Sequence, residues 1–185
     1  MKRRLFIAIN LPENVKNEIE KEIEKIQYAF TNDIRFLDRR NWHITITFLG
    51  YQDDESIVPI VGSLKQIGKE FESFRIHLTD ISYGPKDKTP RMIWLNGSEE
   101  TAKILSRLKE RLENVLTDNG VTFKKERRRL SAHITLARFV GARGLPKIDT
   151  PLALSFPAQS LDLMESHLSR QGADYELLQS FTFKL

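Results

Sequence analysis

The sequence predicts an α+β fold of two pseudo-symmetric lobes, each with an antiparallel sheet and covering helices, on either side of a shared cleft. Strand-like runs bounded by turn residues alternate with helical apolar stripes, which favours sheets covered by a few helices. The order strand, helix, strand, strand also occurs twice, in halves of approximately 1–84 and 91–168. We therefore expect one domain spanning residues 1–185.

The first half predicts two helices among several strand-like segments. Pro12 and Glu13 mark the first helix start, because proline is tolerated in the first turn and an acid favours the positive end of the helix dipole. Its apolar stripe consists of Val15, Ile19, Ile23, Ile26 and Phe30. A second helix, over 57–67, is weakened by Pro59 and Gly62. Strand-like segments lie at 4–10, 35–37, 42–49 and 74–78, before a Tyr-Gly-Pro break at 83–85.

The second half repeats this order and then adds two strands. A strand at 91–95 precedes a helix that begins after Ser98, a favoured N-cap residue. The apolar stripe of this helix consists of Ala102, Leu105, Leu108, Leu112 and Val115, and Asn119-Gly120 ends it. A short strand at 121–123, a charged run at 124–129 and a strand from residue 133 follow. The tail predicts two more strands, at 160–168 and 176–183.

The composition limits the chemistry that this chain can use. It has no cysteine, which excludes disulfides, thiolate zinc sites and a cysteine nucleophile. Its formal net charge of +4 is compatible with a polyanionic partner but does not identify one. No apolar stretch approaches the ~20 residues of a membrane span, and the first apolar run is too short for a secretory signal. We expect a cytoplasmic monomer without a membrane partner.

The tripeptide His-Ile-Thr occurs twice, at 43–45 and at 133–135, each time in a strand-like run. With four histidines and 11 threonines in 185 residues, chance would place a threonine two positions after two of the histidines in about 2% of such sequences. One such pair is more often structural, but two in matched surroundings favour a functional role. The remaining histidines, His77 and His167, are expected on the surface.

Alternation along a strand predicts where each motif side chain points. In the first strand, one face carries His43, Thr45 and Thr47, and the other carries Ile44, Ile46 and Phe48. In the second strand, one face carries His133, Thr135 and Ala137, and the other carries Ile134 and Leu136. Each strand therefore has a polar side that faces the cleft and an apolar side that faces a helix layer.

Two histidines on such strands suit chemistry at one phosphate. One imidazole can accept a proton from water while the other, protonated, donates a proton to a leaving oxygen. The threonine hydroxyls, about 6.6 Å farther along each strand, can donate to the non-bridging oxygens. Neither motif strand contains a carboxylate, so a metal-assisted mechanism is disfavoured and no cofactor is expected.

The motifs His43-Ile44-Thr45-Ile46 and His133-Ile134-Thr135-Leu136 resemble the two signature motifs of the 2H phosphoesterases. The flanking Thr47-Phe48-Leu49-Gly50 and Ala137-Arg138-Phe139 are similar to the branch that contains RNA 2′,3′-cyclic phosphodiesterases, historically called 2′-5′ RNA ligases. The segments 4–12, 164–166 and 172–175 match that branch as well, so the resemblance spans nearly the whole chain.

The resemblance implies metal-independent opening of an RNA terminal 2′,3′-cyclic phosphate to a 2′-phosphomonoester. It implies that His43 donates a proton to the departing 3′ oxygen and that His133 accepts a proton from water. Thr45 and Thr135 would hold the non-bridging oxygens. Arg138 occupies a position associated with phosphate contact, although alternation places it off the His133 face unless the strand bends. The implied partners are RNA ends with a cyclic phosphate, and tRNA fragments and cyclic nucleotides are candidate substrates.

Two further groups are candidates for substrate binding. The run Arg127-Arg128-Arg129 is either a solvated patch or a contact for RNA phosphates, because a terminal cyclic phosphate is attached to further phosphates. Arg127 and Arg129 share a side of the chain, and alternation does not identify which residue of the run points inward. Trp42, Phe48 and Trp94 offer surfaces for stacking the terminal base, with core packing as the alternative for the last two.

Two other functions are compatible with the same residues. The protein would act mainly as a 2′-5′ RNA ligase if a 5′-hydroxyl replaced water as the attacking group. It would be a nucleotide- or RNA-binding module if it kept the pocket without turnover, although intact histidines in both motifs disfavour that function.

Overall fold

The computed structural model describes residues 2–30, 34–126, 130–140, 144–169 and 172–184. Arg127 and Arg129 lie outside the described residues. The helices of the described segments are α1 (Glu13–Gln27), α2 (Ile57–Glu70) and α3 (Glu99–Asp118). Short 3-10 turns lie at Arg39–Asn41 and Asp54–Ser56.

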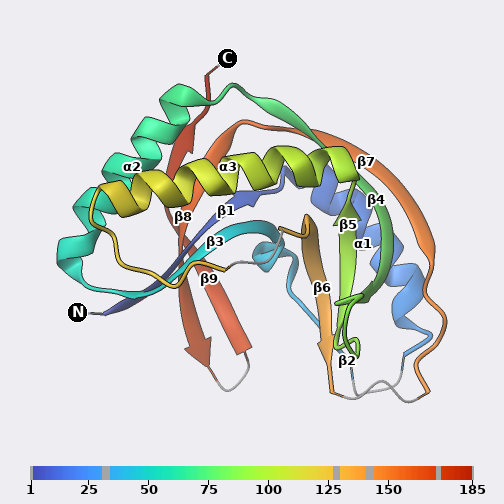
Figure 1. Ribbon diagram of the computed structural model, residues 1–185. Coiled ribbons are helices and arrows are strands. Elements are labelled where there is room, and N and C mark those ends of the chain that lie inside the picture. The colour runs from blue at the N-terminus through green and yellow to red at the C-terminus, as the bar shows by residue number, and fades with distance from the viewer. Residues whose placement is uncertain (1, 31–33, 127–129, 141–143, 170–171, 185) are drawn as a thin grey trace.

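The strands form one curled sheet whose strand pairs are antiparallel (Figure 1). In chain order they are β1 (Arg3–Asn10), β2 (Ile34–Phe36), β3 (His43–Gln52), β4 (Phe74–Gly84), β5 (Met92–Gly97), β6 (His133–Phe139), β7 (Thr150–Ala158), β8 (Ser160–Ser169) and β9 (Gly172–Thr182). Their order across the sheet is β7-β4-β5-β6-β3-β1-β8-β9, and β2 pairs with β6. The predicted α+β class is confirmed, and the two expected sheets are two halves of one curled sheet.

The two halves of the sheet meet at β3 and β6, which pair through Ile44 and Ile134. Each half contains strands from both halves of the sequence. β4 from the first sequence half lies between β7 and β5, and β8 from the second lies beside β1. Each sequence repeat therefore contributes one or more strands to the half of the sheet that is formed mainly by the other repeat.

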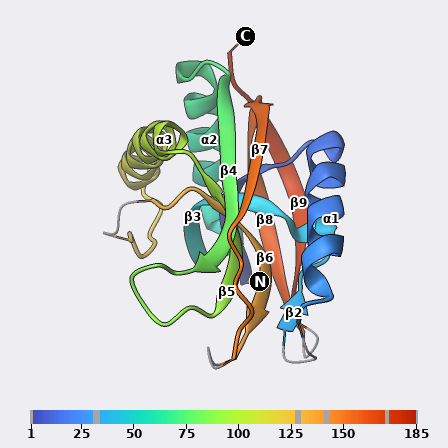
Figure 2. The ribbon, with the colours of Figure 1, turned by 90° about the vertical axis from the view of Figure 1, so that its right-hand side faces the viewer.

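The helices cover the sheet and bury one apolar cluster against it. The predicted stripes of α1 and α3 contribute Val15, Ile19, Ile23, Leu105, Leu108, Leu112 and Val115 to this cluster. Figure 1 shows α2 and α3 side by side, and Figure 2 shows α1 and α3 on opposite sides of the strands. Ser98 caps α3 as predicted, because its hydroxyl accepts a hydrogen bond from the Thr101 N–H at 3.1 Å. In the described residues, no helix is both long and apolar enough to cross a membrane.

Two elements differ from the prediction. β7 was not predicted, and it contains Pro151 and Pro157, a residue type that disfavours strands. Both prolines are tolerated since β7 lies at the edge of the sheet and pairs with β4 alone. The predicted strand at 121–123 is wrong: the Val121 N–H donates to the Leu116 carbonyl at the end of α3, and the Thr122 carbonyl accepts from the Gln52 side chain.

Helix α2 forms despite Pro59 because this proline lies in its first turn, where helical N–H groups have no partner within the helix. Two glycines of α2 differ in their surroundings. A Cβ added at Gly62 would meet no atom within 4 Å, whereas one at Gly68 would lie 2.6 Å from the Thr182 carbonyl oxygen of β9. Gly68 therefore permits the close approach of α2 to β9.

These two glycines give a matched pair of substitutions. We expect Gly62→Ala to raise the free energy of unfolding by about 0.5–1 kcal/mol, because alanine restricts the unfolded chain more than glycine. Gly68→Ala should lower it by about 1–3 kcal/mol through overpacking. Urea unfolding monitored by circular dichroism measures both. Equal effects of the two substitutions would contradict the close packing of α2 on β9.

Candidate active site

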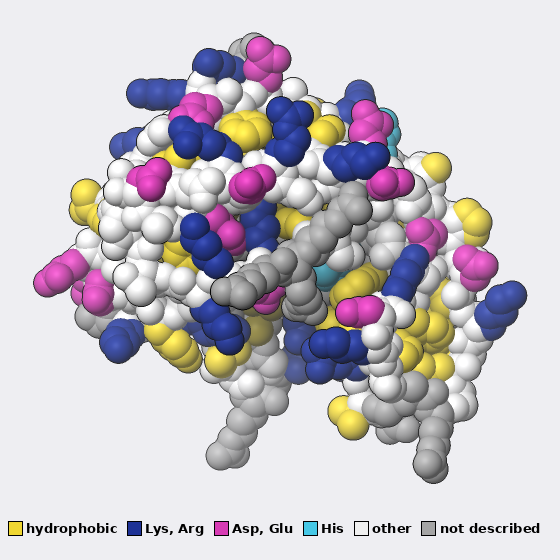
Figure 3. Space-filling view, in the orientation of Figure 1, with side chains coloured by type: hydrophobic (Ala, Val, Ile, Leu, Met, Phe, Trp, Pro, Cys, Tyr) yellow, Lys and Arg dark blue, Asp and Glu magenta, His cyan; other side chains and the backbone are white. Residues whose placement is uncertain are grey.

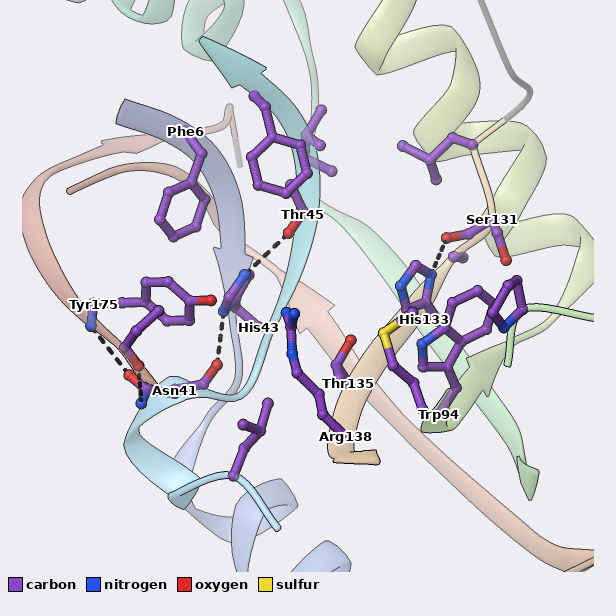
Figure 4. A pocket seen from close by; sticks show the side chains of 18 of the residues that line it. Phe6, Asn41, His43, Thr45, Trp94, Ser131, His133, Thr135, Arg138 and Tyr175 are labelled. Carbon is purple, nitrogen blue, oxygen red and sulfur yellow. Dashed lines mark hydrogen bonds between the residues drawn. The ribbon is translucent and has the colours of Figure 1, made fainter. Parts of the chain in front are cut away.

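Both histidine motifs lie at the start of a strand, since β3 begins at His43 and β6 begins at His133. Ile44 and Ile134 are 1% and 0% exposed, so the flanking histidines and threonines point to the opposite face. Because these two isoleucines pair across the strands, the two motifs lie side by side. Both line one cleft with a volume of about 1300 Å³ (Figure 4).

A β-bulge follows the first motif. Ala8 of β1 pairs with Thr45, and the adjacent Ile7 pairs with Thr47, so Ile46 is the extra residue. An extra residue reverses the alternation beyond it. The predicted direction of Thr47 is therefore wrong: Thr47 is buried, and its hydroxyl donates to Glu113 Oε1 at 2.7 Å. The predicted direction of Phe48 is also wrong, because this side chain is 48% exposed and lines the cleft.

A matching bulge follows the second motif. Trp94 of β5 pairs with Thr135, and the adjacent Ile93 pairs with Ala137, so Leu136 is the extra residue. Ala137 is buried, so its predicted position on the His133 face is wrong. The bulge supplies the bend that Arg138 requires, and this arginine lines the cleft. Figure 4 shows the Arg138 side chain reaching between the two motifs.

The backbone sets the same tautomer for both histidines. His43 Nδ1 lies 2.8 Å from the Asn41 carbonyl oxygen, and His133 Nδ1 lies 2.7 Å from the Ser131 carbonyl oxygen. A carbonyl oxygen only accepts hydrogen bonds, so each Nδ1 carries a proton and donates it. The neutral rings therefore present an unprotonated Nε2, and His43 Nε2 lies 3.0 Å from Thr45 Oγ1.

Aromatic rings enclose His43. The Phe6 ring lies 5.0 Å from the His43 ring, and the Tyr175 ring meets His43 edge-on at the same distance. Asn41 fixes Tyr175 because its Oδ1 accepts from the Tyr175 N–H at 3.2 Å and its Nδ2 donates to the Ala173 carbonyl at 3.3 Å. Asn41 thus attaches β9 to the strand that carries His43.

A different ring packs on His133. Trp94 of β5 stacks on this imidazole with a centroid distance of 3.8 Å and an angle of 23° between the planes. Gly84 lies against the Trp94 ring, since an added Cβ there would overlap it. Trp94 is 8% exposed, so its use is packing against His133. Trp42 is buried in the core at 3% exposure, so its predicted role in base stacking is wrong.

Burial lowers the pKa of both histidines, because a low-dielectric environment disfavours the imidazolium. The pKa of His43 falls from 6.5 to about 4, mainly by burial and further by the charges of His133 and Arg138, while the Asn41 carbonyl opposes the shift. The pKa of His133 is also lowered by burial, and the Ser131 carbonyl opposes this shift. Near neutral pH both rings are therefore neutral in the ligand-free protein.

The cleft is large and rich in cations. Its volume exceeds that of most small-molecule pockets, which are about 300–1,000 Å³. The basic side chains that line it are Arg4, Arg35, Lys86, Arg91, Lys109 and Arg138. Figure 3 shows Lys and Arg side chains around the hollow on this face. A positive cleft of this size suits a polyanion that extends beyond a single phosphate.

One group of described residues has the spacing of metal ligands. Ligand atoms of Glu165, His167 and Glu176, on β8 and β9, lie within 4.8 Å of one another. Glu165 is paired with Arg3 at 2.5 Å, and His167 Nε2 lies 3.0 Å from Glu176 Oε2. None of these residues belongs to the set that lines the cleft. This group of three residues therefore lies apart from the cleft that holds the two histidine motifs.

Similar proteins have related sequences along most of the chain. A family model described as "LigT like Phosphoesterase" matches residues 9–94. The RNA 2′,3′-cyclic phosphodiesterase of Aeropyrum pernix is 33% identical over 153 residues, covering 78% of this chain and 84% of that protein. The protein of the same name from Bacillus subtilis is 31% identical, covering 97% of this chain and 95% of that protein. This chain belongs to the LigT-like phosphoesterase family.

Solved structures have the same fold as this LigT-like phosphoesterase. The crystal structure of Escherichia coli LigT complexed with 3′-AMP has a TM-score of 0.81 and 22% identity, and 100% of each chain is covered. The crystal structure of TT0787 from Thermus thermophilus has a TM-score of 0.80 and 24% identity, and 98% of each chain is covered. The fold of this chain is therefore shared with both structures.

The fold brings six predicted site residues of this LigT-like phosphoesterase into one cleft: His43, Thr45, Phe48, His133, Thr135 and Arg138. His77 and His167 are exposed, as predicted. Sequence reasoning missed Phe6, Asn41 and Tyr175. Alternation along 4–10 would have placed Phe6 on the face opposite to the core, but no local signal connects Tyr175 to a histidine 132 positions earlier.

The lowered pKa values predict how the stability of this LigT-like phosphoesterase depends on pH. An unfolded histidine titrates near 6.5, so from pH 6.5 down to about 4 the unfolded chain binds more protons than the folded chain. The free energy of unfolding should be fully retained above pH 6.5 and fall through this window, by about 1.4 kcal/mol for each unit of pKa shift. Urea unfolding at a series of pH values measures this slope.

The matched variants are His43→Ala and His77→Ala. The first removes the buried group and should flatten the slope between pH 6.5 and 4, whereas the second removes an exposed histidine and should keep it. The same slope in the parent and in the His43 variant would contradict the burial of a neutral imidazole.

Proposed function

We propose that this protein opens the terminal 2′,3′-cyclic phosphate of RNA to a 2′-phosphomonoester by acid–base catalysis without a metal ion. One observation carries the proposal: two His-Ile-Thr motifs present Nε2 atoms of the same tautomer to one cleft, with Arg138 between them. The activity agrees with the names of the relatives from Aeropyrum pernix and Bacillus subtilis.

The reaction needs one neutral and one protonated histidine. His133 Nε2 accepts a proton from the water that attacks phosphorus. The bond between phosphorus and the 3′ oxygen breaks, and His43 Nε2 donates its proton to that oxygen. The products are a 2′-phosphate and a 3′-hydroxyl, and proton exchange with solvent restores the starting state. The bound phosphate supplies the negative charge that raises the pKa of His43 far enough to protonate it.

The remaining motif residues bind the phosphate. The Thr45 hydroxyl, which donates to neutral His43 in the free protein, turns to a non-bridging oxygen once that ring is protonated. Thr135 donates to the other non-bridging oxygen, and the Arg138 guanidinium neutralises the charge that develops in the transition state. Arg138 is suited to this role because its side chain extends into the cleft between the motifs.

Substrate recognition is proposed to extend from the phosphate to the terminal nucleotide. The exposed ring of Phe48 offers a face on which the terminal base stacks. Arg127 and Arg129, which precede the second motif in sequence, are proposed to contact backbone phosphates. We propose a cytoplasmic monomer whose substrates are RNA ends, including tRNA fragments and cyclic nucleotides.

Substitution of either histidine tests the mechanism. We expect His43→Ala and His133→Ala each to lower kcat by ~10²-fold or more, because one proton transfer commonly contributes 10²–10⁴-fold. The activity of the unmodified protein should persist in EDTA. The measurement uses an RNA that ends in a cyclic phosphate, with mass-spectrometric identification of the product, and His77→Ala is the control because His77 is exposed.

Product identification separates the competing functions. Loss of activity in EDTA together with tolerated histidine substitutions would indicate a metal mechanism. A 2′-5′ linked product in the presence of RNA with a 5′-hydroxyl would indicate a ligase as the main role. Binding of the RNA end without any product would indicate a non-catalytic module.

The pH dependence of turnover gives a second test. The ratio kcat/KM reports the free protein, in which both pKa values lie below 6.5, so its bell-shaped profile should have its maximum below pH 6.5. The kcat profile reports the complex, in which the phosphate raises both pKa values, and should be shifted to higher pH. Initial rates between pH 4 and 9 measure both profiles. A kcat/KM maximum above pH 7 would exclude two buried neutral histidines in the free protein.

A further inference from the structure

Two adjacent arginines of β1 have different partners. Arg3, on the core side of the strand, forms an ion pair with Glu165 of β8 at 2.5 Å. Arg4, on the cleft side, donates from Nη1 to the Ser166 hydroxyl at 2.8 Å. Among the described residues, Arg4 forms no ion pair with a carboxylate. Arg4 therefore carries an uncompensated charge into the cleft.

The contact with Ser166 orients the Arg4 guanidinium without neutralising it. A guanidinium has five N–H donors in a planar fork, and its geometry matches the oxygens of a phosphate. The serine hydroxyl engages one side of this fork. Within the described part of the chain no further partner of this guanidinium is found, so its remaining donors and its positive charge can bind an anion in the cleft.

Arg4 lies farther along β1 than the residues that pair with the first motif. Ala8 pairs with Thr45, and Arg4 lies four residues farther along β1, about 13 Å away at 3.3 Å per residue. The Arg4 side chain spans part of this distance, but its guanidinium is held at the Ser166 hydroxyl of β8. An aromatic surface lies between Arg4 and the first motif, because the Phe6 ring lies 5.0 Å from the His43 ring and 6.0 Å from the Phe48 ring.

We infer that Arg4 and Ser166 form a second phosphate site, which binds a phosphodiester upstream of the terminal nucleotide of the RNA. The inference rests on the proposed function and specifies its substrate. The terminal base lies over Phe48, and the backbone continues to Arg4 along the wall formed by β1 and β8. Oligonucleotides with a terminal cyclic phosphate are then better substrates than nucleoside 2′,3′-cyclic monophosphates, which have one phosphate alone.

The test compares two substrates in one set of variants. The substrates are a nucleoside 2′,3′-cyclic monophosphate and a trinucleotide with the same terminal cyclic nucleotide. Arg4→Gln keeps a donor for Ser166 but removes the charge, and Arg4→Lys keeps the charge. Arg75→Ala is the control, since Arg75 is exposed, donates to the Ser155 hydroxyl at 3.5 Å and lies outside the set that lines the cleft.

For Arg4→Gln we expect the ratio of kcat/KM for the trinucleotide to kcat/KM for the mononucleotide to fall about 10-fold, as for loss of a charged hydrogen bond. The slope of log KM against log salt for the trinucleotide should fall by about 0.7, the value for one phosphate contact of a single strand. Arg4→Lys should retain most of the kcat/KM ratio of the unmodified protein. Arg75→Ala should leave both the ratio and the salt slope unchanged.

Three outcomes would overturn the inference. An unchanged ratio in Arg4→Gln would show that no upstream phosphate contacts this arginine. Equal losses on both substrates would show that Arg4 supports the structure of the reaction site. A loss of the ratio in Arg91→Ala but not in Arg4→Gln would place the backbone on the opposite wall of the cleft. Failure of the unmodified protein to open either cyclic phosphate would instead refute the proposed function.

Discussion

The backbone pair between Ile44 and Ile134 joins β3 to β6, and thereby the two halves of the sheet, and places both histidine motifs in one cleft. Both isoleucines are buried, so the side chains on either side of each must point away from the core. In the described residues β3 pairs with β6 at this point alone, so the two strands can diverge and leave a cleft beside the motifs. The position of the two motifs relative to each other depends on this contact.

The two motifs occupy equivalent positions but have different surroundings. Phe6 and Tyr175 enclose His43, whereas Trp94 stacks on His133. The position five residues after each histidine also differs, with a phenyl group in Phe48 and a guanidinium in Arg138. A symmetric backbone thus carries two chemically different surroundings, with an aromatic ring after the first motif and a guanidinium after the second.

Much of the fold could be predicted because its signals are local. Apolar spacing identified the helix stripes, and Ser98 marked the start of α3. β7 escaped prediction because its prolines are acceptable only at a sheet edge, and edge position is a property of the assembled sheet. The basic run at 127–129 was predicted from composition, and its role stays a prediction because it lies outside the described residues.

The sequence by itself determined the two histidine motifs and the direction of His43, Thr45, His133 and Thr135, because alternation over three residues requires no partner strand. Only the tertiary structure decided the direction of Phe48 and Arg138, since a bulge is an extra residue relative to a neighbouring strand. It also decided the pKa values, because the groups that bury the histidines come from distant parts of the chain. Desolvation depends on where those parts pack, and no local pattern encodes that position.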